Sequence, residues 1–301
     1  MTDQATGAGI RTVGVLGAGL MGSGIAQVAA TAGYDTWVRE PAAPALERGL
    51  AAITASLGKL VQKGALAAAE RDATLRRLRL TTDLAPVAAC DLVIEAVTEE
   101  LELKNALWRE LDALAPRGTI FASNTSSLSI GAMAAATSRA DRFVGLHFFN
   151  PVPLMPLVEV VQTGATSADT LQRALGFARS LGKQAVVARD TPGFLVNLLL
   201  VPYLLDAVRA LERGVGTVTD LDTAMRLGAG HPMGPFTLLD VVGIDTVVRI
   251  ADIMFGEYRE ARYAAPALLR RMAAAGRHGR KAGRGFYDYS ATPPVPLDPD
   301  L

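Results

Sequence analysis

The stretch VGVLGAGLMGSGIAQVAATAGYDTWVRE, residues 13–40, decides the fold. Its apolar start predicts a strand, and the glycines that follow predict a tight turn. Apolar residues then recur at helical spacing as far as Gly33, where a helix should stop, and YDTWV at residues 34–38 predicts a second strand. A strand, a glycine turn, a helix and a strand in this order are typical of a dinucleotide-binding unit.

The turn fits the pattern GxGxxG, and six residues are expected to hold the cofactor: Gly17, Ala18, Gly19, Leu20, Met21 and Gly22. Glycines here permit the turn and a close approach of pyrophosphate, while the helix N-terminus offers N–H groups. Glu40 ends the second strand, where a carboxylate binds ribose hydroxyls and repels a 2′-phosphate, so we expect NAD as cofactor. Arg39 beside it weakens this preference. The alternative is a turn without a ligand and an exposed Glu40.

Outward from this unit, apolar runs alternate with helical periodicity as far as Arg189. Further strands are expected at residues 92–97, 119–122, 143–148, 157–162 and 185–188, and helices at 44–79 (one or two), 101–114, 167–181, 191–211, 221–228 and 245–258. This alternation predicts an α/β, Rossmann-type domain with a mostly parallel sheet over residues 1–189. An all-helical domain for substrate binding and dimer contacts should follow over residues 190–301.

The charges balance, with 30 Lys and Arg against 30 Asp and Glu, so we expect neither a nucleic-acid partner nor a membrane partner. No apolar run approaches the ~18 residues of a membrane span, and the start of the chain lacks a signal pattern, so a cytoplasmic protein is expected. The single cysteine, Cys90, excludes an internal disulfide and a cysteine-rich metal site; it should be buried and inert, and no metal is expected. The polar, proline-rich tail at residues 290–301 is expected to lack fixed structure.

Among the three histidines, His147 has the surroundings of a general base. It ends a strand in GLHFFNPVP, and strand ends carry ligands in open sheets. Glu159 lies inside the apolar strand LVEVV, where an unpaired charge would be costly, so a histidine is a plausible partner. Such a pair lets the imidazole take a proton from a substrate hydroxyl while hydride leaves the same carbon. The alternative is a buried histidine with Glu159 bonded elsewhere.

Two polar features stay ambiguous from the residues alone. FASNTSSLSI places polar residues 123–127 just after a strand, and Asn197 interrupts the apolar helix FLVNLLLVPYLL. Each needs a hydrogen-bond partner if it is buried. Ser126 fits helix capping as well as a ligand contact, and Asn197 fits a bond between helices equally well.

The motifs GAGLMGSGIAQ, IEAVTEELELK, FASNTSSLSI, GLHFFNPVP, LVEVV, DTPGFLVN, GAGHPMGPFTLLD and KAGRGFYDY together resemble the free-standing 3-hydroxyacyl-CoA dehydrogenases, which include 3-hydroxybutyryl-CoA dehydrogenases. The resemblance spans about residues 11–290. It implies NAD-dependent oxidation of an L-3-hydroxyacyl-CoA to the 3-ketoacyl-CoA. The residues implied in catalysis are His147 as the base, Glu159 orienting it, and Ser126 and Asn197 contacting the substrate.

The resemblance also implies further binding residues: Glu99, Lys104, Ser126 and Asn150 at the nicotinamide half of the cofactor, Lys281 reaching the cofactor from the second domain, and Ser56 and Lys63 at coenzyme A. Two departures from the family pattern stand out. Glu40 replaces an aspartate, which leaves the ratio of NAD to NADP use open. The helix from Pro44 is poor in lysine, which fits weaker coenzyme A binding or a carrier-protein substrate.

Three other functions fit the same residues. One is a dehydrogenase for a hydroxyacyl group held on acyl carrier protein in specialised metabolism. Another is a non-catalytic, crystallin-like NAD-binding protein, although intact His147 and Glu159 argue against it. The third is a sugar-acid dehydrogenase, since a fold does not fix the substrate. The apolar surface expected on the helical domain predicts a homodimer formed through it.

Overall fold

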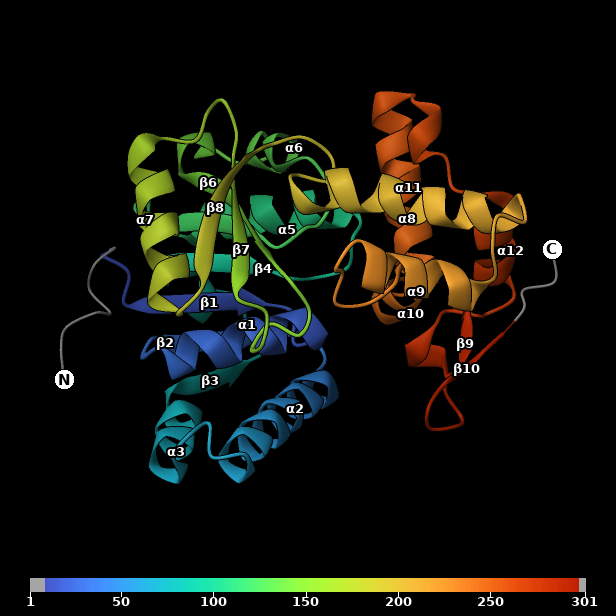
Figure 1. Cartoon of the computed structure of the whole chain (residues 1–301). Helices are drawn as coiled ribbons and strands as arrows, with labels where there is room; N and C mark the ends of the chain where they lie inside the picture. The colour runs from blue at the N-terminus through green and yellow to red at the C-terminus, as the bar shows by residue number, and fades with distance from the viewer. Residues whose placement is uncertain (1–8, 298–301) are drawn as a thin grey trace. The chain divides into compact units, whose positions relative to one another are not determined.

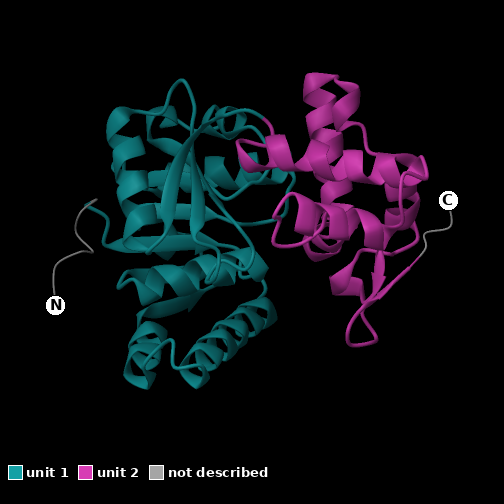
Figure 2. Cartoon of the chain, viewed as in Figure 1, with its two compact units in different colours: residues 1–191 teal, residues 192–301 magenta. Residues whose placement is uncertain are grey.

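The computed structural model describes residues 9–297, and the chain divides into two compact units after Thr191 (Figure 2). The first unit contains an eight-stranded sheet with helices on both faces. The second unit begins at Pro192 and consists of helices with a small two-stranded sheet near its end. These two architectures confirm the predicted fold class, a Rossmann-type α/β half followed by a helical half.

The strands of the large sheet lie in the order β3-β2-β1-β4-β5-β6-β7-β8 (Figure 1). Their bounds are β1 (Thr12–Leu16), β2 (Asp35–Arg39), β3 (Leu78–Thr81), β4 (Leu92–Glu95), β5 (Ile120–Ser123), β6 (Phe143–Phe148), β7 (Leu157–Gln162) and β8 (Gln184–Arg189). Neighbouring strands run parallel except β6 and β7, which are antiparallel. The strand order reverses at β1, and ligands bind outside the carboxyl ends of strands at such a reversal.

Helices cover both faces of this sheet. They are α1 (Leu20–Thr31), α2 (Ala43–Gln62), α3 (Ala68–Arg77), α4 (Ala85–Ala88), α5 (Leu101–Leu114), α6 (Ile130–Ala134), the short 3₁₀ turn η1 (Ala140–Arg142) and α7 (Ala168–Ser180). On one face α1 and α7 share a core, where the rings of Tyr34 and Phe177 are 5.2 Å apart. On the other face Trp108 of α5 packs on Phe121 and Phe143, at 5.0 and 4.8 Å between ring centroids. Side chains of each strand therefore alternate between these two layers.

The predicted elements between residues 92 and 189 match the observed ones to within two residues at each end. The stretch at 44–79 contains two helices, α2 and α3, but ends in the strand β3, which the sequence pattern does not indicate. This strand lies at the edge of the sheet and is only partly buried, so it lacks the continuous apolar run of the central strands. The four-residue α4 and five-residue α6 are too short to show a period.

The second unit contains α8 (Val196–Glu212), α9 (Val218–Gly228), α10 (Pro235–Val242), α11 (Ile244–Tyr258), η2 (Ala261–Tyr263), α12 (Ala267–Ala274), η3 (Arg280–Ala282), β9 (Tyr287–Asp288) and β10 (Val295–Pro296). Its core is a separate apolar cluster drawn from most of these helices, with Leu205, Phe236 and Ala251 fully buried. A core of its own allows each unit to be stable as a compact body.

The expectation that the tail lacks fixed structure is wrong for its first part. Val295–Pro296 forms β10, which pairs antiparallel with β9, and the Leu297 N–H donates to the Phe286 carbonyl at 2.8 Å. Composition alone could not reveal this partner strand. The last four residues of the tail, 298–301, lie outside the described residues.

Cys90 is 2% exposed, which confirms the predicted buried thiol. Burial, reinforced by the neighbouring Asp91 carboxylate, raises the pKa of this thiol to about 12. Within residues 9–297 no helix has the length and apolarity to cross a membrane. In the same part of the chain, no group of three or more His, Cys, Asp or Glu side chains could hold a metal ion.

Candidate active site

The glycine turn at residues 17–22 joins β1 to α1, and its geometry requires glycine. Gly17 has a φ of +100°, and a Cβ on it would lie 2.7 Å from the Ala96 carbonyl oxygen. A Cβ on Gly22 would lie 1.9 Å from the Gly17 carbonyl oxygen. A Cβ on Gly19, in contrast, would meet no described atom within 4 Å. The turn is therefore closed beneath Gly17 and Gly22 and open above Gly19, where a ligand could approach the backbone.

A cavity of about 560 Å³ opens over this turn. Its lining includes six of the predicted site residues: Ala18, Gly19, Leu20, Glu40, Ser56 and Asn150. Met21 packs against the core instead. The Glu40 carboxylate accepts a hydrogen bond from the Ala18 N–H at 3.3 Å, so the acid lies beside the turn. Arg48 of α2, an exposed cation, also lines this cavity.

These residues fit a dinucleotide. Helix α1 begins after Gly19, no described side chain caps it, and its first turn contains no acid. The N–H groups of its first turn therefore face the cavity and can donate hydrogen bonds to an anion. Glu40 supplies an acceptor for ribose hydroxyls beside the same turn.

His147 and Glu159 lie directly opposite each other on the antiparallel strands β6 and β7. Side chains of such a pair lie on the same face of the sheet. His147 Nδ1 and Glu159 Oε2 are 2.5 Å apart, with Glu159 fully buried and His147 5% exposed. The pairing inferred from the sequence is confirmed. A carboxylate on Nδ1 directs the ring proton to that nitrogen, so Nε2 is the basic one.

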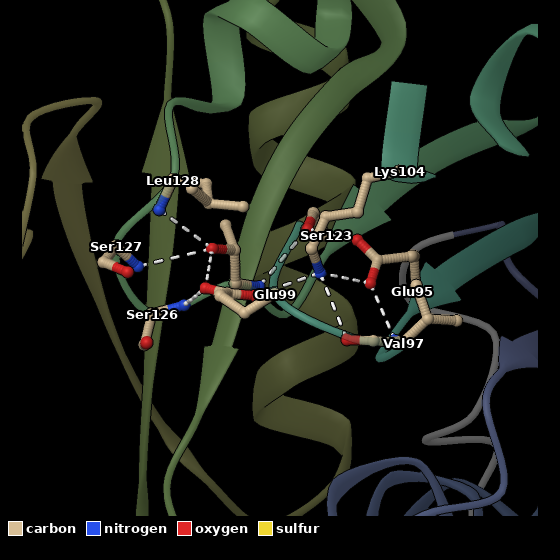
Figure 3. Close-up of polar contacts among 9 residues, drawn as sticks. Glu95, Val97, Glu99, Lys104, Ser123, Ser126, Ser127 and Leu128 are labelled. Carbon is tan, nitrogen blue, oxygen red and sulfur yellow. Dashed lines mark hydrogen bonds and ion pairs between the residues drawn. The ribbon is translucent and has the colours of Figure 1, made fainter. Parts of the chain in front are cut away.

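Ser126 lies in the loop after β5, and Glu99 holds this loop (Figure 3). The Glu99 carboxylate accepts hydrogen bonds from the Ser126 N–H at 3.1 Å and from the Thr125 hydroxyl. Burial acts to raise the pKa of Glu99, but the Lys104 ammonium and these hydrogen bonds outweigh it and hold the pKa below its ordinary value. Helix capping does not explain Ser126, because Ser129 is the N-cap of α6.

Lys104 is 1% exposed beneath this loop. Its ammonium lies 2.5 Å from Glu95 Oε1 and 3.1 Å from Glu99 Oε2, between two carboxylates (Figure 3). Lys104 thus holds Glu99 in place, and Glu99 in turn holds the Ser126 loop. Its place near the nicotinamide stays a prediction.

Three predicted site residues lie elsewhere. Lys63 is the exposed C-cap of α2 and is outside the cavity lining. Asn197 is partly buried in the first turn of α8, and Lys281 forms an ion pair with Asp245 at 2.7 Å. Because Asn197 and Lys281 belong to the second unit, their part in the site stays a prediction.

Sequence reasoning missed two residues, Glu95 and Arg48. Glu95 carries the same signal as Glu159, an acid within an apolar strand run, LVIEAV. That signal could have identified it. The only sequence signal for Arg48 is its spacing from Ser56, which places both side chains on one face of α2 and so on the same wall of the cavity.

The first unit has a doubly wound sheet, with a cavity over the glycine turn where the strand order reverses. It also has a His–Glu pair at the end of a strand. These features together define a nucleotide-dependent dehydrogenase. Residues 12–191 match the 3-hydroxyacyl-CoA dehydrogenase NAD binding domain, and residues 193–289 match the C-terminal domain of the same enzymes. The chain belongs to the 3-hydroxyacyl-CoA dehydrogenase family, and its cofactor is NAD.

Individual relatives agree with this assignment. A 3-hydroxybutyryl-CoA dehydrogenase of Mycobacterium tuberculosis is 49% identical over 282 residues, which cover 93% of this chain and 99% of the relative. The human mitochondrial hydroxyacyl-coenzyme A dehydrogenase is 47% identical over 287 residues, covering 93% and 91%. The crystal structure of (S)-3-hydroxybutyryl-CoA dehydrogenase PaaH1 from Ralstonia eutropha has a TM-score of 0.90 at 41% identity, covering 94% and 100%. The resemblance inferred from the motifs is confirmed.

Proposed function

We propose that this chain catalyses the reversible, NAD-dependent oxidation of L-3-hydroxybutyryl-CoA to acetoacetyl-CoA. The observation that carries the proposal is the hydrogen bond of 2.5 Å between His147 Nδ1 and Glu159 Oε2 at the end of β6. It supports general-base chemistry on a hydroxyl group. The names of the Mycobacterium and Ralstonia relatives, which specify 3-hydroxybutyryl-CoA, support this acyl group.

In the oxidation, His147 Nε2 takes the proton of the 3-hydroxyl group, and Glu159 stabilises the imidazolium that forms. NAD, when bound at the glycine turn, would supply the acceptor for the hydride of the same carbon. The Ser126 hydroxyl and the Asn197 amide hydrogen-bond the substrate and hold its oxygen toward Nε2. In the reduction, the protonated Nε2 returns its proton to that oxygen.

The remaining predicted residues serve binding in this proposal. The glycine turn holds the pyrophosphate, and Glu40 holds the adenosine ribose. Glu99, Lys104 and Asn150 support the nicotinamide half, to which Lys281 contributes from the second unit. Ser56 and Lys63 meet coenzyme A, and the position of Ser56 in the cavity wall supports its part. Residues 190–301 serve substrate binding and dimer contacts in this proposal.

A comparison of nucleotides and acyl substrates tests this proposal. Oxidation of NADH and of NADPH is followed with acetoacetyl-CoA and, separately, with acetoacetyl groups on acyl carrier protein. We expect kcat/KM with NADH and acetoacetyl-CoA to exceed kcat/KM with each other combination by about tenfold or more. The preference for NADH is expected because Glu40 in the cavity repels the 2′-phosphate of NADPH. Preference for the carrier-linked substrate would establish the runner-up function. No turnover of any acyl thioester by folded protein would reject catalysis on thioesters.

The chain is also proposed to form a homodimer through its second unit and to work in the cytoplasm. Leu199 on α8 and Leu227 on α9 are 72% and 73% exposed, and a second copy of the same surface would cover them. The mammalian relatives are described as mitochondrial, whereas the names of the bacterial relatives give no compartment. Fractionation of native cells with an antibody to the chain tests the location.

A further inference from the structure

Glu95, the last residue of β4, is fully buried and has no part in the mechanism above. Its carboxylate accepts hydrogen bonds from the Val97 N–H at 2.8 Å, the Lys104 ammonium at 2.5 Å and the Ser123 hydroxyl at 2.7 Å (Figure 3). The Ser123 oxygen itself accepts from the Thr125 N–H at 3.2 Å, which directs the hydroxyl proton toward Glu95. Each of these contacts brings a donor, as an ionised carboxylate requires.

Lys104 joins Glu95 to Glu99, whose pKa lies below its ordinary value despite burial, because of the Lys104 charge and its hydrogen bonds. The cluster Glu95–Lys104–Glu99 thus holds two carboxylates and one ammonium. It carries one unbalanced negative charge, with Glu95 and Lys104 buried and Glu99 partly exposed. An unbalanced buried charge costs free energy, and such charges gather where a site uses them.

This cluster shares a face of the sheet with the proposed base. Glu95 of β4 lies opposite Ser123 of β5, and Ser123 lies opposite Gly145 of β6. Gly145 and His147 are two residues apart on one strand, so they point to the same face. The negative cluster and His147 therefore lie along the carboxyl ends of three adjacent parallel strands.

We infer that the buried charge of Glu95 biases the site toward the oxidised form of the nucleotide. The inference rests on the proposed function, which brings the nicotinamide ring next to His147. The oxidised ring carries a positive charge, and the hydride removes it. A negative charge nearby therefore stabilises the oxidised form more than the reduced form. Glu95 sets the ratio of the two affinities through its field and does not touch the ring.

Glu95→Gln removes this charge with little change of shape. The amide oxygen accepts from Val97 and Lys104, and the amide group donates to the Ser123 hydroxyl. Calorimetric titration gives the dissociation constants of NAD⁺ and NADH for the unchanged protein and the variant. We expect the affinity for NAD⁺ to fall by about 3- to 30-fold relative to that for NADH. A ratio that stays within about twofold in folded Glu95→Gln protein overturns the inference.

Two controls separate charge from structure. Glu110→Gln makes the same charge change on an exposed part of α5, where solvent screens it, and should leave the ratio unchanged; an equal shift there overturns the special role of the buried charge. Ser123→Ala removes a hydrogen bond but keeps the charge, so its ratio should also stay unchanged.

If Glu95→Gln does not fold, Glu99→Gln neutralises the same cluster from its more accessible end. It must shift the ratio in the same direction, and no shift overturns the inference. Failure of the unchanged protein to bind either nucleotide is a different result, because it rejects the proposed function itself.

Discussion

Glu159 has no exposed surface, and its carboxylate lies 2.5 Å from His147 Nδ1. A carboxylate in this place has two effects on the imidazole. It keeps the proton on Nδ1, and it lowers the free energy of the imidazolium that forms when Nε2 takes a proton. A glutamine there retains the first effect in part, through its amide oxygen, but it loses the second.

We therefore expect Glu159→Gln to fold and to lower kcat by about 10²–10⁴-fold. Steady-state kinetics with acetoacetyl-CoA and NADH measures the loss, and circular dichroism checks the fold. Glu110→Gln, the same substitution on an exposed part of α5, should keep full activity. A kcat of Glu159→Gln within about threefold of the unchanged protein would remove Glu159 from the mechanism.

The sequence predicts Glu159 as a paired acid and marks Glu95 by the same pattern, but the partner of Glu95 could be identified only from the structure. The partner of Glu159 is a histidine, which chemistry identifies as a base. The partner of Glu95 is Lys104, and a lysine on a helix ordinarily faces solvent. Whether this part of α5 is buried depends on the packing of Trp108 against the sheet, which the spacing of residues does not specify.

At the scale of elements, backbone contact fixes the turn between β1 and α1. Gly22 must lie against the Gly17 carbonyl, whereas Gly58, inside α2 near its C-terminal end, would carry a Cβ that meets no described atom within 4 Å. The same substitution should therefore have opposite effects at these two helical glycines.

Gly22→Ala should destabilise the protein by about 1–3 kcal/mol and weaken NADH binding, because the added carbon pushes on backbone. Gly58→Ala should stabilise it by about 0.5–1 kcal/mol, because alanine loses less chain entropy in a helix. Urea denaturation of both variants measures these changes. Equal effects of the two substitutions would contradict the geometry of the turn.

The end of the second unit is fastened to Asp240 of α10. Its carboxylate accepts hydrogen bonds from the Phe286 and Tyr287 N–H groups, both at 2.9 Å, and a Cβ on Gly285 would lie 2.0 Å from it. The glycines of KAGRGFYDY therefore allow close packing around a buried acid. Burial, with a smaller effect of Asp222, raises the pKa of Asp240 to about 6.

Because this pKa is raised in the folded state, protonation of Asp240 favours the folded state. Its contribution is complete below about pH 4 and is lost as the pH rises through about 6. We expect the free energy of opening of residues 279–289 to fall over this range, as measured by hydrogen–deuterium exchange corrected for intrinsic rates. Asp240→Asn should abolish the dependence. An opening free energy that rises with pH would show that the sign is wrong.

Among the elements, the long helices and most strands of the sheet could be predicted, whereas the edge strand β3, the short helices and the pair β9–β10 could not. The helix α5 matches its expected bounds, since leucines mark one face over its whole length. The helices α10 and α12, of eight residues each, escaped prediction because two turns give too few apolar repeats. The pair β9–β10 owes its existence to contacts of Asp240 and Phe286 that only the folded chain brings together.

At the scale of the whole molecule, two separate cores correspond to the two parts that the family comparison also distinguishes. The class of each part could be predicted, because alternation of strands and helices stops near Thr191. The assembly of the chain into a dimer could not be predicted in the same way, since it depends on which apolar surface a second copy covers.

If the second unit forms the dimer, Leu199→Asp with Leu227→Asp should give a monomer, because two buried charges would oppose the contact. Light scattering after size exclusion measures the mass. Leu114→Asp, at a 52% exposed leucine of the first unit, should leave the dimer intact. A monomeric unchanged protein, or a dimer that only Leu114→Asp separates, would place the contact elsewhere.

His147 is the proposed base of this NAD-dependent 3-hydroxyacyl-CoA dehydrogenase. The most direct measurement is the absorbance of NADH formed from L-3-hydroxybutyryl-CoA and NAD⁺ by the unchanged protein and by His147→Gln. We expect the unchanged protein to form NADH rapidly and His147→Gln to lower this rate by about 10²–10⁴-fold, with NADH still bound normally. A rate of NADH formation by folded His147→Gln within about tenfold of that of the unchanged protein would show that His147 is not the base.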